Sequence, residues 1–201
     1  ARAYWRRRGL DDKTIVRFGL GYAPNDGQAL YQYLRDKGYN QQELDASGLF
    51  KRSPSGRIYC LFWKRVMTPI FDLRGNIIAF GGRVMDDSKP KYVNSPETLV
   101  YHKSETVFAM QIAKRSASRR FVLCEGYMDV ISMQQAGIDT AVCACGTALT
   151  PGQVRIISEY ADEVILSYDS DEAGQKATLR SLELFRNSPV KVGVLQIPGA
   201  K

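Results

Sequence analysis

The pattern of apolar and polar positions is clearest from residue 120 onward, where short apolar runs alternate with helical stretches. Four runs predict β-strands, at residues 120–125, 140–144, 163–169 and 191–197. Helices are predicted between them, at residues 127–136, 150–161 and 171–187, with Gly137 and the Thr150-Pro151 pair as stop and start signals. Because strands that alternate with helices form parallel sheets, this part predicts an α/β fold with a four-stranded parallel sheet flanked by helices.

The residues before this point follow a less regular pattern, which predicts a mixed α+β fold. Short helices are expected at residues 13–18, 28–37, 40–46 and 105–113, and strands at residues 64–71 and 76–84. Gly75 lies in the predicted hairpin turn between the two strands, where a positive φ is needed. A polar loop is expected at residues 86–96 and a basic linker at residues 114–119. We therefore divide the chain into an N-terminal subdomain, residues 1–117, and a C-terminal subdomain, residues 118–201.

The two parts of the chain differ in net charge, which suggests that they have different roles. The chain has 201 residues, of which 44% are hydrophobic and 24% charged, as in soluble globular proteins. Residues 1–120 hold 22 Lys and Arg against 11 Asp and Glu, whereas residues 121–201 hold 6 against 10. One part could attract a polyanion such as a nucleic acid while the other holds a cation, although basic surfaces also serve solubility.

Neither a membrane segment nor a zinc site is indicated. The N-terminal charges are not followed by an apolar core, and no apolar run approaches the roughly 20 residues that cross a bilayer. We expect a soluble, cytoplasmic protein with no membrane partner. The four cysteines form no C-x-x-C pair and His102 is the only histidine, so reduced core thiols are expected rather than metal ligands.

Three acidic residues lie where a parallel sheet usually places its chemistry. Glu125 follows the first predicted strand of the C-terminal subdomain, and Asp169 and Asp171 follow the third. Side chains beyond the carboxyl ends of parallel strands converge in one crevice, and Mg²⁺ prefers such hard oxygen ligands. Two such ions can hold the attacking and leaving oxygens of a phosphoryl transfer. The alternative is structural, because an Asp here is often only a helix N-cap, and Asp171 could be one.

Asp129 lies one turn into the first helix of this subdomain, and two interpretations of it stay open. Its carboxylate could point into the same crevice as the other acids. It could equally interact favourably with the positive end of the helix dipole.

The segments that carry these acids resemble the Toprim domain, which bacterial primases share with type IA and type II topoisomerases and some nucleases. The resemblance rests on the sequences EGYMDV at 125–130, CGTA at 145–148 and YDSDEAG at 168–174, the first of which is characteristic of primases. It implies that Glu125, Asp169 and Asp171 bind the metal ions, Mg²⁺ or Mn²⁺, and that Asp129 supports them.

The similarity to bacterial DnaG-type primases covers nearly the whole chain. Further matching stretches lie at residues 62–70, 80–84, 91–98 and 102–103, and they resemble the basic ridge that holds template and nucleotides. The resemblance implies nucleic-acid or nucleotide contacts for Arg65, Arg83, Lys91, Asn94 and Lys103. The residue types alone leave another interpretation open, since each Lys or Arg could be a solvated surface charge and Asn94 could cap its loop.

Two departures from the family shape our expectations. Primases of this type carry an N-terminal zinc-binding module, for which this chain has no cysteine pattern, so zinc is expected only in a module absent from it. They also carry a third acidic motif after a Pro-Gly stretch, and the chain ends at Lys201, soon after Pro198-Gly199. We therefore expect an excised core that lacks this motif and the helicase-binding region, with weak activity or none.

The resemblance implies a DNA primase catalytic core, a metal-dependent DNA-directed RNA polymerase. It would make short RNA primers from ribonucleoside triphosphates on single-stranded DNA, at the replication fork in the nucleoid, and a replicative helicase would bind through the absent region. A Toprim nuclease or topoisomerase is the first rival, although a topoisomerase needs a tyrosine nucleophile on another domain. A non-catalytic DNA-binding module, indifferent to Mg²⁺, is the second.

Overall fold

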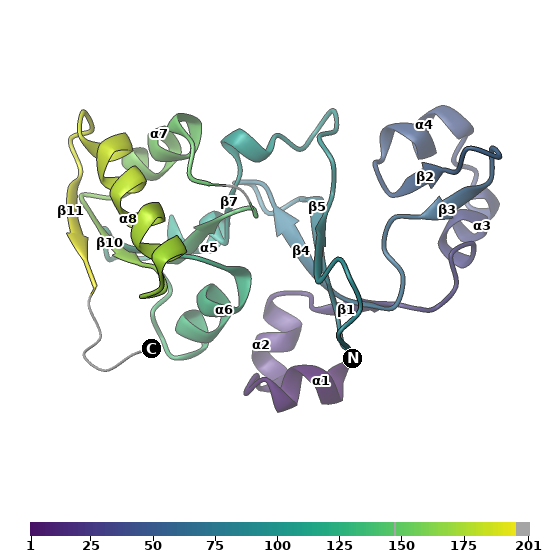
Figure 1. The fold of residues 1–201 in the computed structure, drawn as a ribbon, viewed down its shortest axis with the longest axis horizontal. Coiled ribbons are helices and arrows are strands. Elements are labelled where there is room, and N and C mark those ends of the chain that lie inside the picture. Colours follow the sequence, from purple (N-terminus) through teal and green to yellow (C-terminus); the bar gives the residue numbers. More distant parts are fainter. Residues whose placement is uncertain (147, 196–201) are drawn as a thin grey trace. The chain divides into compact units, whose positions relative to one another are not determined.

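The computed structural model describes residues 1–146 and 148–195, which form two compact units (Figure 1). The first unit comprises Ala1–Ile70 and Ile77–His102, and the second comprises Phe71–Asn76 and the described residues from Lys103 onward. The tip of one hairpin, Phe71–Asn76, thus belongs to the second unit although its two strands belong mainly to the first. The division into domains at residues 117 and 118 stays a proposal.

The first unit combines short helices with an antiparallel sheet, as the mixed pattern predicts. The sheet has the order β1-β4-β5-β6, with bounds β1 (Gly21–Ala23), β4 (Arg65–Phe71), β5 (Ile77–Val84) and β6 (Tyr92–Asn94). A separate antiparallel pair is formed by β2 (Phe50–Arg52) and β3 (Ile58–Cys60). The helices are α1 (Arg2–Arg7), α2 (Asp12–Arg17), α3 (Ala29–Asp36) and α4 (Gln41–Ala46).

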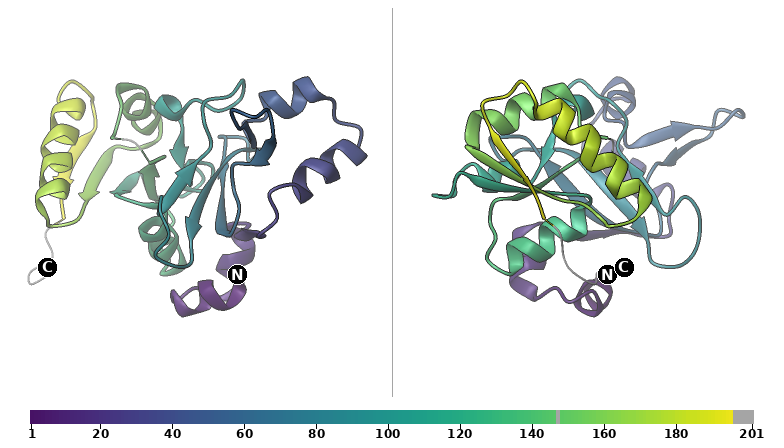
Figure 2. Two further views of the ribbon diagram at one scale, coloured as in Figure 1. Left: turned by 45° about the vertical axis from the view of Figure 1, so that its right-hand side comes forward. Right: turned by 60° about the vertical axis from the view of Figure 1, so that its left-hand side comes forward.

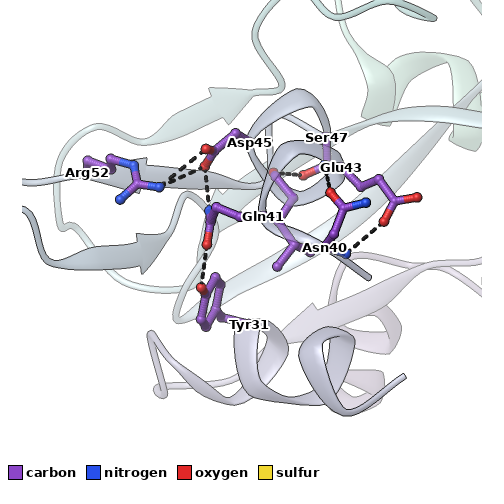
Figure 3. Close-up of polar contacts among 8 residues, drawn as sticks. Tyr31, Asn40, Gln41, Glu43, Asp45, Ser47 and Arg52 are labelled. Atoms are coloured by element: carbon purple, nitrogen blue, oxygen red, sulfur yellow. Dashed lines mark hydrogen bonds and ion pairs between the residues drawn. The ribbon is translucent and has the colours of Figure 1, made fainter. Parts of the chain in front are cut away.

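A chain of polar contacts links α3, α4 and β2 within the first unit (Figure 3). The Tyr31 hydroxyl donates to Gln41 Oε1 at 2.7 Å, and Gln41 Nε2 donates to Asp45 Oδ1 at 2.8 Å. Arg52 on β2 completes the chain by donating to Asp45 Oδ2 at 3.3 Å. Tyr31 also packs edge-on against Phe50, so an apolar contact adds to the polar ones between α3 and β2.

The sequence pattern missed several short elements of the first unit. Helix α1 was not predicted, and strand β6 lies inside the segment 86–96 that was expected to be a loop. Pairing with β5 makes this segment a strand, since Tyr92 and Asn94 lie opposite Arg83 and Gly81. A strand of three polar or half-buried residues has no apolar alternation of its own, so only its partner defines it.

The second unit contains the predicted parallel sheet and adds one strand to it. The order is β11-β10-β8-β9-β7, with bounds β7 (Val107–Phe108), β8 (Arg120–Cys124), β9 (Ala141–Ala144), β10 (Glu163–Ser167) and β11 (Lys191–Val194). The four predicted strands are parallel, whereas β7 pairs antiparallel with β9. The predicted fold class is therefore confirmed, with five strands in the sheet instead of four.

Helices cover both faces of this sheet. Their bounds are α5 (Met110–Ala113), α6 (Tyr127–Gln135), α7 (Pro151–Tyr160) and α8 (Glu172–Phe185), and a 3₁₀ turn, η1, spans Lys103–Glu105. Figure 2 shows α7 and α8 on one face and α6 on the other. The core between sheet and helices is apolar and includes Phe121, Leu123, Ile157, Leu166 and Phe185.

The helix expected at residues 105–113 is largely wrong. Val107 and Phe108 are buried in strand β7, and the helix that follows spans only Met110–Ala113. Ala109 separates the two elements with a φ of +63°, a left-handed conformation that cannot continue a helix. Tertiary pairing with β9 thus overrides the local helical preference of this segment.

Two further expectations concern cysteines and membranes. All four cysteines are free and buried, which confirms that they are core thiols. Of the helices that the structure describes, none is both long and apolar enough to span a membrane.

Residue 147 of the predicted CGTA segment and the predicted strand residues 196–197 lie outside the described residues, as do Pro198, Gly199 and Lys201.

Candidate active site

The second unit brings Glu125 and Asp169 together at the carboxyl ends of two neighbouring strands. Strands β8 and β10 pair in parallel register, with Cys124 opposite Ser167, so the chain leaves both strands at the same edge. The Glu125 carboxylate oxygen Oε2 accepts a hydrogen bond from the Asp169 main-chain N–H at 3.2 Å. Both residues are exposed, so a ligand has access to this edge. The convergence that the sequence predicts for these two acids is thus present.

Asp171 has the structural role that the sequence left open, because it is the N-cap of α8. Its Oδ1 accepts a hydrogen bond from Gly174 N at 2.8 Å, which satisfies one of the free N–H groups of the first helical turn. Gly174 is buried against the Asp169 main chain, where a Cβ atom would collide with the carbonyl of Asp169. Glycine therefore lets α8 begin directly beside the end of β10.

Asp129 is likewise held by the start of a helix. Its Oδ2 accepts a hydrogen bond from the main-chain N–H of Gly126 at 3.0 Å, at the beginning of α6. Negative charge in the first turn of a helix also interacts favourably with the helix dipole. This hydrogen bond agrees with the helix-terminal interpretation of Asp129, and its support of the other acids stays a prediction.

Tyr168 connects the end of β10 to the body of α8. Its hydroxyl lies 3.0 Å from the hydroxyl of Ser181, which is buried. Burial raises the pKa of Tyr168, and the hydrogen bond with Ser181 only partly offsets this effect, so the phenol is neutral at physiological pH. This bond ties the residue before Asp169 to the helix that follows it.

The oxygen donors at this edge suit a hard divalent cation. Within residues 1–146 and 148–195, no three His, Cys, Asp or Glu side chains are grouped closely enough to hold a metal ion. The acids present are carboxylates, which Mg²⁺ and Mn²⁺ prefer. The adjacent thiols do not compete, because burial raises the pKa of Cys124 to about 12 and that of Cys143 well above its ordinary value. Protonated thiols are poor metal ligands, so the donor set favours Mg²⁺ or Mn²⁺ over a thiophilic ion.

Arg65 in the first unit, for which the resemblance implies a nucleic-acid contact, is buried and bonded to the main chain. The residue is 5% exposed, and its guanidinium donates to three main-chain carbonyls: Pro90 at 2.8 Å, Lys91 at 3.3 Å and Gly82 at 3.5 Å. Burial lowers the pKa of Arg65 from its ordinary value. This placement makes Arg65 a support for the main chain of Lys91 instead of a charge presented to solvent.

Arg83 on β5 lies between two tyrosine rings. Its guanidinium carbon is 5.6 Å from the centre of the Tyr4 ring and 5.7 Å from that of Tyr92, and its Nε donates to the Tyr92 hydroxyl at 3.1 Å. Such cation–π contacts hold a planar guanidinium in one orientation. Tyr92 is 52% exposed, so the pair presents an aromatic and a basic group on one surface.

The other expected contacts lie on short elements near strand β5 or in the second unit. Lys91 is exposed and precedes β6, while Asn94 is half-buried opposite Gly81. Lys103 begins the 3₁₀ turn η1 of the second unit and is half-buried. Sequence reasoning missed the buried residues that hold these positions. One signal was available, because Thr150 and Gln153 have the T-x-x-Q spacing of a capping box.

Comparison with known proteins agrees with this fold. Residues 122–201 match the family described as Toprim-like. Residues 1–114 match the family described as DNA primase catalytic core, N-terminal domain, and the chain belongs to this family.

Individual relatives extend the match over the whole chain. A DNA primase of Clostridium acetobutylicum is 43% identical over 202 residues, which cover 100% of this chain and 34% of the relative. The zinc-binding and RNA polymerase domains of the Aquifex aeolicus primase superpose with a TM-score of 0.92 at 34% identity, covering 100% of this chain and 50% of that one. A DnaG primase catalytic domain bound to single-stranded DNA superposes with a TM-score of 0.88 at 35% identity, covering 100% and 66%. The chain spans about a third of the length of the curated relatives it matches.

Proposed function

We propose that this chain is the catalytic core of a DNA primase, which synthesises short RNA primers from ribonucleoside triphosphates on single-stranded DNA. The observation that carries the proposal is the meeting of Glu125 and Asp169 at the edge of the parallel sheet. The acid pair lies in a chain whose relatives are named DNA primases, and one related catalytic domain has been solved with single-stranded DNA bound. The activity would take place at the replication fork.

Glu125, Asp169 and Asp171 would hold Mg²⁺ or Mn²⁺, with Asp129 in support. No three acids are grouped closely enough for this within the described residues, so the three carboxylates would have to draw together on the ion. When bound, the ion would supply positive charge that neutralises the triphosphate. The chain's own contribution is to hold the carboxylates at fixed strand ends. Asp171 would have to exchange its bond to Gly174 for the metal, so its capping role and its ligand role would compete.

The basic first unit would hold the nucleic acid and the nucleotides. Arg83 and Lys91 are proposed to contact phosphates, Asn94 to form a hydrogen bond with a nucleotide, and Lys103 of the second unit to contact a triphosphate. Because such contacts neutralise phosphates without reading bases, they would give affinity that falls with salt. Template, ribonucleoside triphosphates and RNA primer are thus the proposed partners, and a replicative helicase and a zinc-binding module would act through other parts of a longer protein.

The decisive experiment is primer synthesis by the full-length protein with Asp169→Asn. The change keeps the size and the main-chain N–H that Glu125 accepts from, but removes a charge that a cation needs. We expect a loss of primer synthesis of about 100-fold or more. Asp162→Asn is the matched control, since Asp162 precedes the same strand at its other end and pairs with Arg119 at 2.9 Å. Full activity of the Asp169 variant would refute the proposal.

Product analysis of the same reaction separates the proposed function from its rivals. A primase makes new RNA that depends on both template and ribonucleoside triphosphates. A nuclease or topoisomerase would cut or relax the DNA without them. A non-catalytic binding module would bind DNA equally well with and without Mg²⁺ and would give no product.

A further inference from the structure

The turn that carries Lys103 is held by a glutamine that lies 50 residues away in the sequence. Gln153 on α7 is completely buried, and its Nε2 donates to the carbonyl of Lys103 at 2.9 Å and to that of Thr106 at 2.8 Å. Its Oε1 accepts from the main-chain N–H of Thr150 at 3.1 Å. One side chain therefore binds the first residue of the 3₁₀ turn η1 and the residue that follows the turn, and connects both to the start of α7.

Two neighbours of Gln153 bring the turn still closer to α7. The Thr150 hydroxyl donates to the carbonyl of Ser104 at 2.5 Å. Gly152 lies directly against the same residue, because a Cβ atom there would be 2.6 Å from the Ser104 carbonyl oxygen. Only glycine allows this approach without moving the turn. The carbonyls of Lys103, Ser104 and Thr106 are thus all bound by the first turn of one helix.

This arrangement is costly to alter because the glutamine amide has no access to water. Both hydrogen atoms of Nε2 are used, and a buried polar group that loses its partner keeps its full desolvation penalty. The exposed ion pair between Arg155 and Glu105, at 3.4 Å, lies on the same two elements but is screened by solvent and contributes little. Gln153 therefore contributes buried hydrogen bonds to the main-chain position of Lys103 that an exposed ion pair does not replace.

We propose that Gln153 is a positioning residue, which fixes the main chain of Lys103 so that this lysine meets the nucleotide triphosphate. The inference rests on the proposed function, in which Lys103 contacts the nucleotide. If the main chain of Lys103 shifts, its ammonium group reaches the phosphate in fewer of its conformations. Losing Gln153 should therefore weaken nucleotide binding. The chemical step, which depends on the acids of the sheet edge, is expected to change little.

The test is steady-state primer synthesis by the full-length protein with Gln153→Met, at varied ribonucleoside triphosphate concentration. Methionine keeps the length of the side chain and removes both donors. We expect KM for the nucleotide to rise about 5- to 20-fold with kcat within about 2-fold of the parent. Gln134→Met is the matched control, because Gln134 is also a buried helical glutamine, with Nε2 donating to the Ala141 carbonyl at 3.0 Å. The control should lose stability without a change in KM.

A double-mutant cycle with Lys103→Ala separates positioning from general structural damage. If Gln153 acts through Lys103, Gln153→Met adds nothing to the KM of the Lys103→Ala protein. If the double variant raises KM by the product of the two single-variant increases, the proposal is overturned. An unchanged KM in Gln153→Met alone would also overturn it. An unchanged KM in Lys103→Ala would also overturn it, while the proposed function would still stand or fall by the Asp169→Asn result.

Gly152→Ala keeps the proposal testable if Gln153→Met does not fold. The added methyl group pushes against the Ser104 carbonyl and displaces the turn while leaving Gln153 in place. We expect the same rise in KM, again absent when Lys103 is alanine. A folded Gly152→Ala protein with the parent's KM would contradict the proposal.

Discussion

The carboxylate of Glu125 accepts a hydrogen bond from the main-chain N–H of Asp169, at 3.2 Å, across two neighbouring parallel strands. The two residues are 44 positions apart in the sequence, and the parallel pairing of β8 with β10 brings them together. The same main-chain segment of Asp169 is packed against Gly174. The acids at this edge are therefore positioned by backbone contacts, which makes the site sensitive to substitutions that carry no charge.

Gly174→Ala tests this dependence on the backbone. The added methyl group would collide with the carbonyl of Asp169, so α8 or the end of β10 must move. We expect the free energy of unfolding to fall by about 1–3 kcal/mol, measured by urea denaturation, and Mn²⁺ binding to weaken in calorimetry. Gly193→Ala is the comparison, since its Cβ would meet only the end of the Ile165 side chain, at 3.0 Å. Equal losses in the two variants would contradict this view of the site.

Substitutions of Asp171 can separate helix capping from metal binding. Asparagine caps a helix about as well as aspartate, whereas alanine does not, so Asp171→Asn should keep the stability that Asp171→Ala loses, about 1 kcal/mol. Both changes remove the negative charge and should therefore weaken Mn²⁺ binding, measured by calorimetry. Unchanged Mn²⁺ binding in both variants would leave Asp171 with its capping role alone.

Arg65 and Lys91 should differ in how they affect binding to single-stranded DNA. Lys91→Ala removes a proposed phosphate contact, so the slope of log affinity against log salt should fall in magnitude by about 0.7. Arg65→Met removes hydrogen bonds to the carbonyls of residues 82, 90 and 91, and, if Arg65 acts only as a main-chain support, it removes no contact with DNA. It should lower the free energy of unfolding by about 1–3 kcal/mol and leave the salt slope unchanged. Fluorescence titrations at several salt concentrations measure both slopes, and a reduced slope for Arg65→Met would contradict its structural role.

Cys124 should be inert at neutral pH in the folded protein. Burial raises the pKa of its thiol to about 12 from an ordinary value of 9.0, so little thiolate forms at pH 8. Iodoacetamide labelling followed by mass spectrometry should show slow modification of Cys124 at pH 8, and fast modification after unfolding in urea. Because the folded state favours the protonated thiol, its contribution to stability is complete below pH 9 and is lost as the pH rises toward 12. Rapid labelling of the folded protein at pH 8 would contradict this placement.

Much of the second unit followed from the sequence because its strands and helices carry strong local signals. The apolar runs before Glu125 and Asp169 are continuous, and Thr150-Pro151 and Gly137 mark helix ends by their own conformational preferences. The short strand at Tyr92–Asn94 and the interrupted segment around Ala109 had no such signal. Their conformations depend on pairing with β5 and β9, which are distant in the sequence.

The sequence by itself determined the parallel α/β fold of the second unit, the four buried thiols and the acids at the strand ends. These features depend on local periodicity and on the rule that the carboxyl ends of parallel strands lie at the same edge of their sheet. Only the tertiary structure decided that the buried Arg65 donates to the carbonyl of Lys91, that Asp171 caps α8, and that Gln153 donates to the carbonyl of Lys103. Each of these roles is a hydrogen bond to a main-chain group, and main-chain groups are the same at every residue. A local pattern can suggest a helix cap, as it did for Asp171, but it cannot identify the distant carbonyls that Arg65 and Gln153 reach.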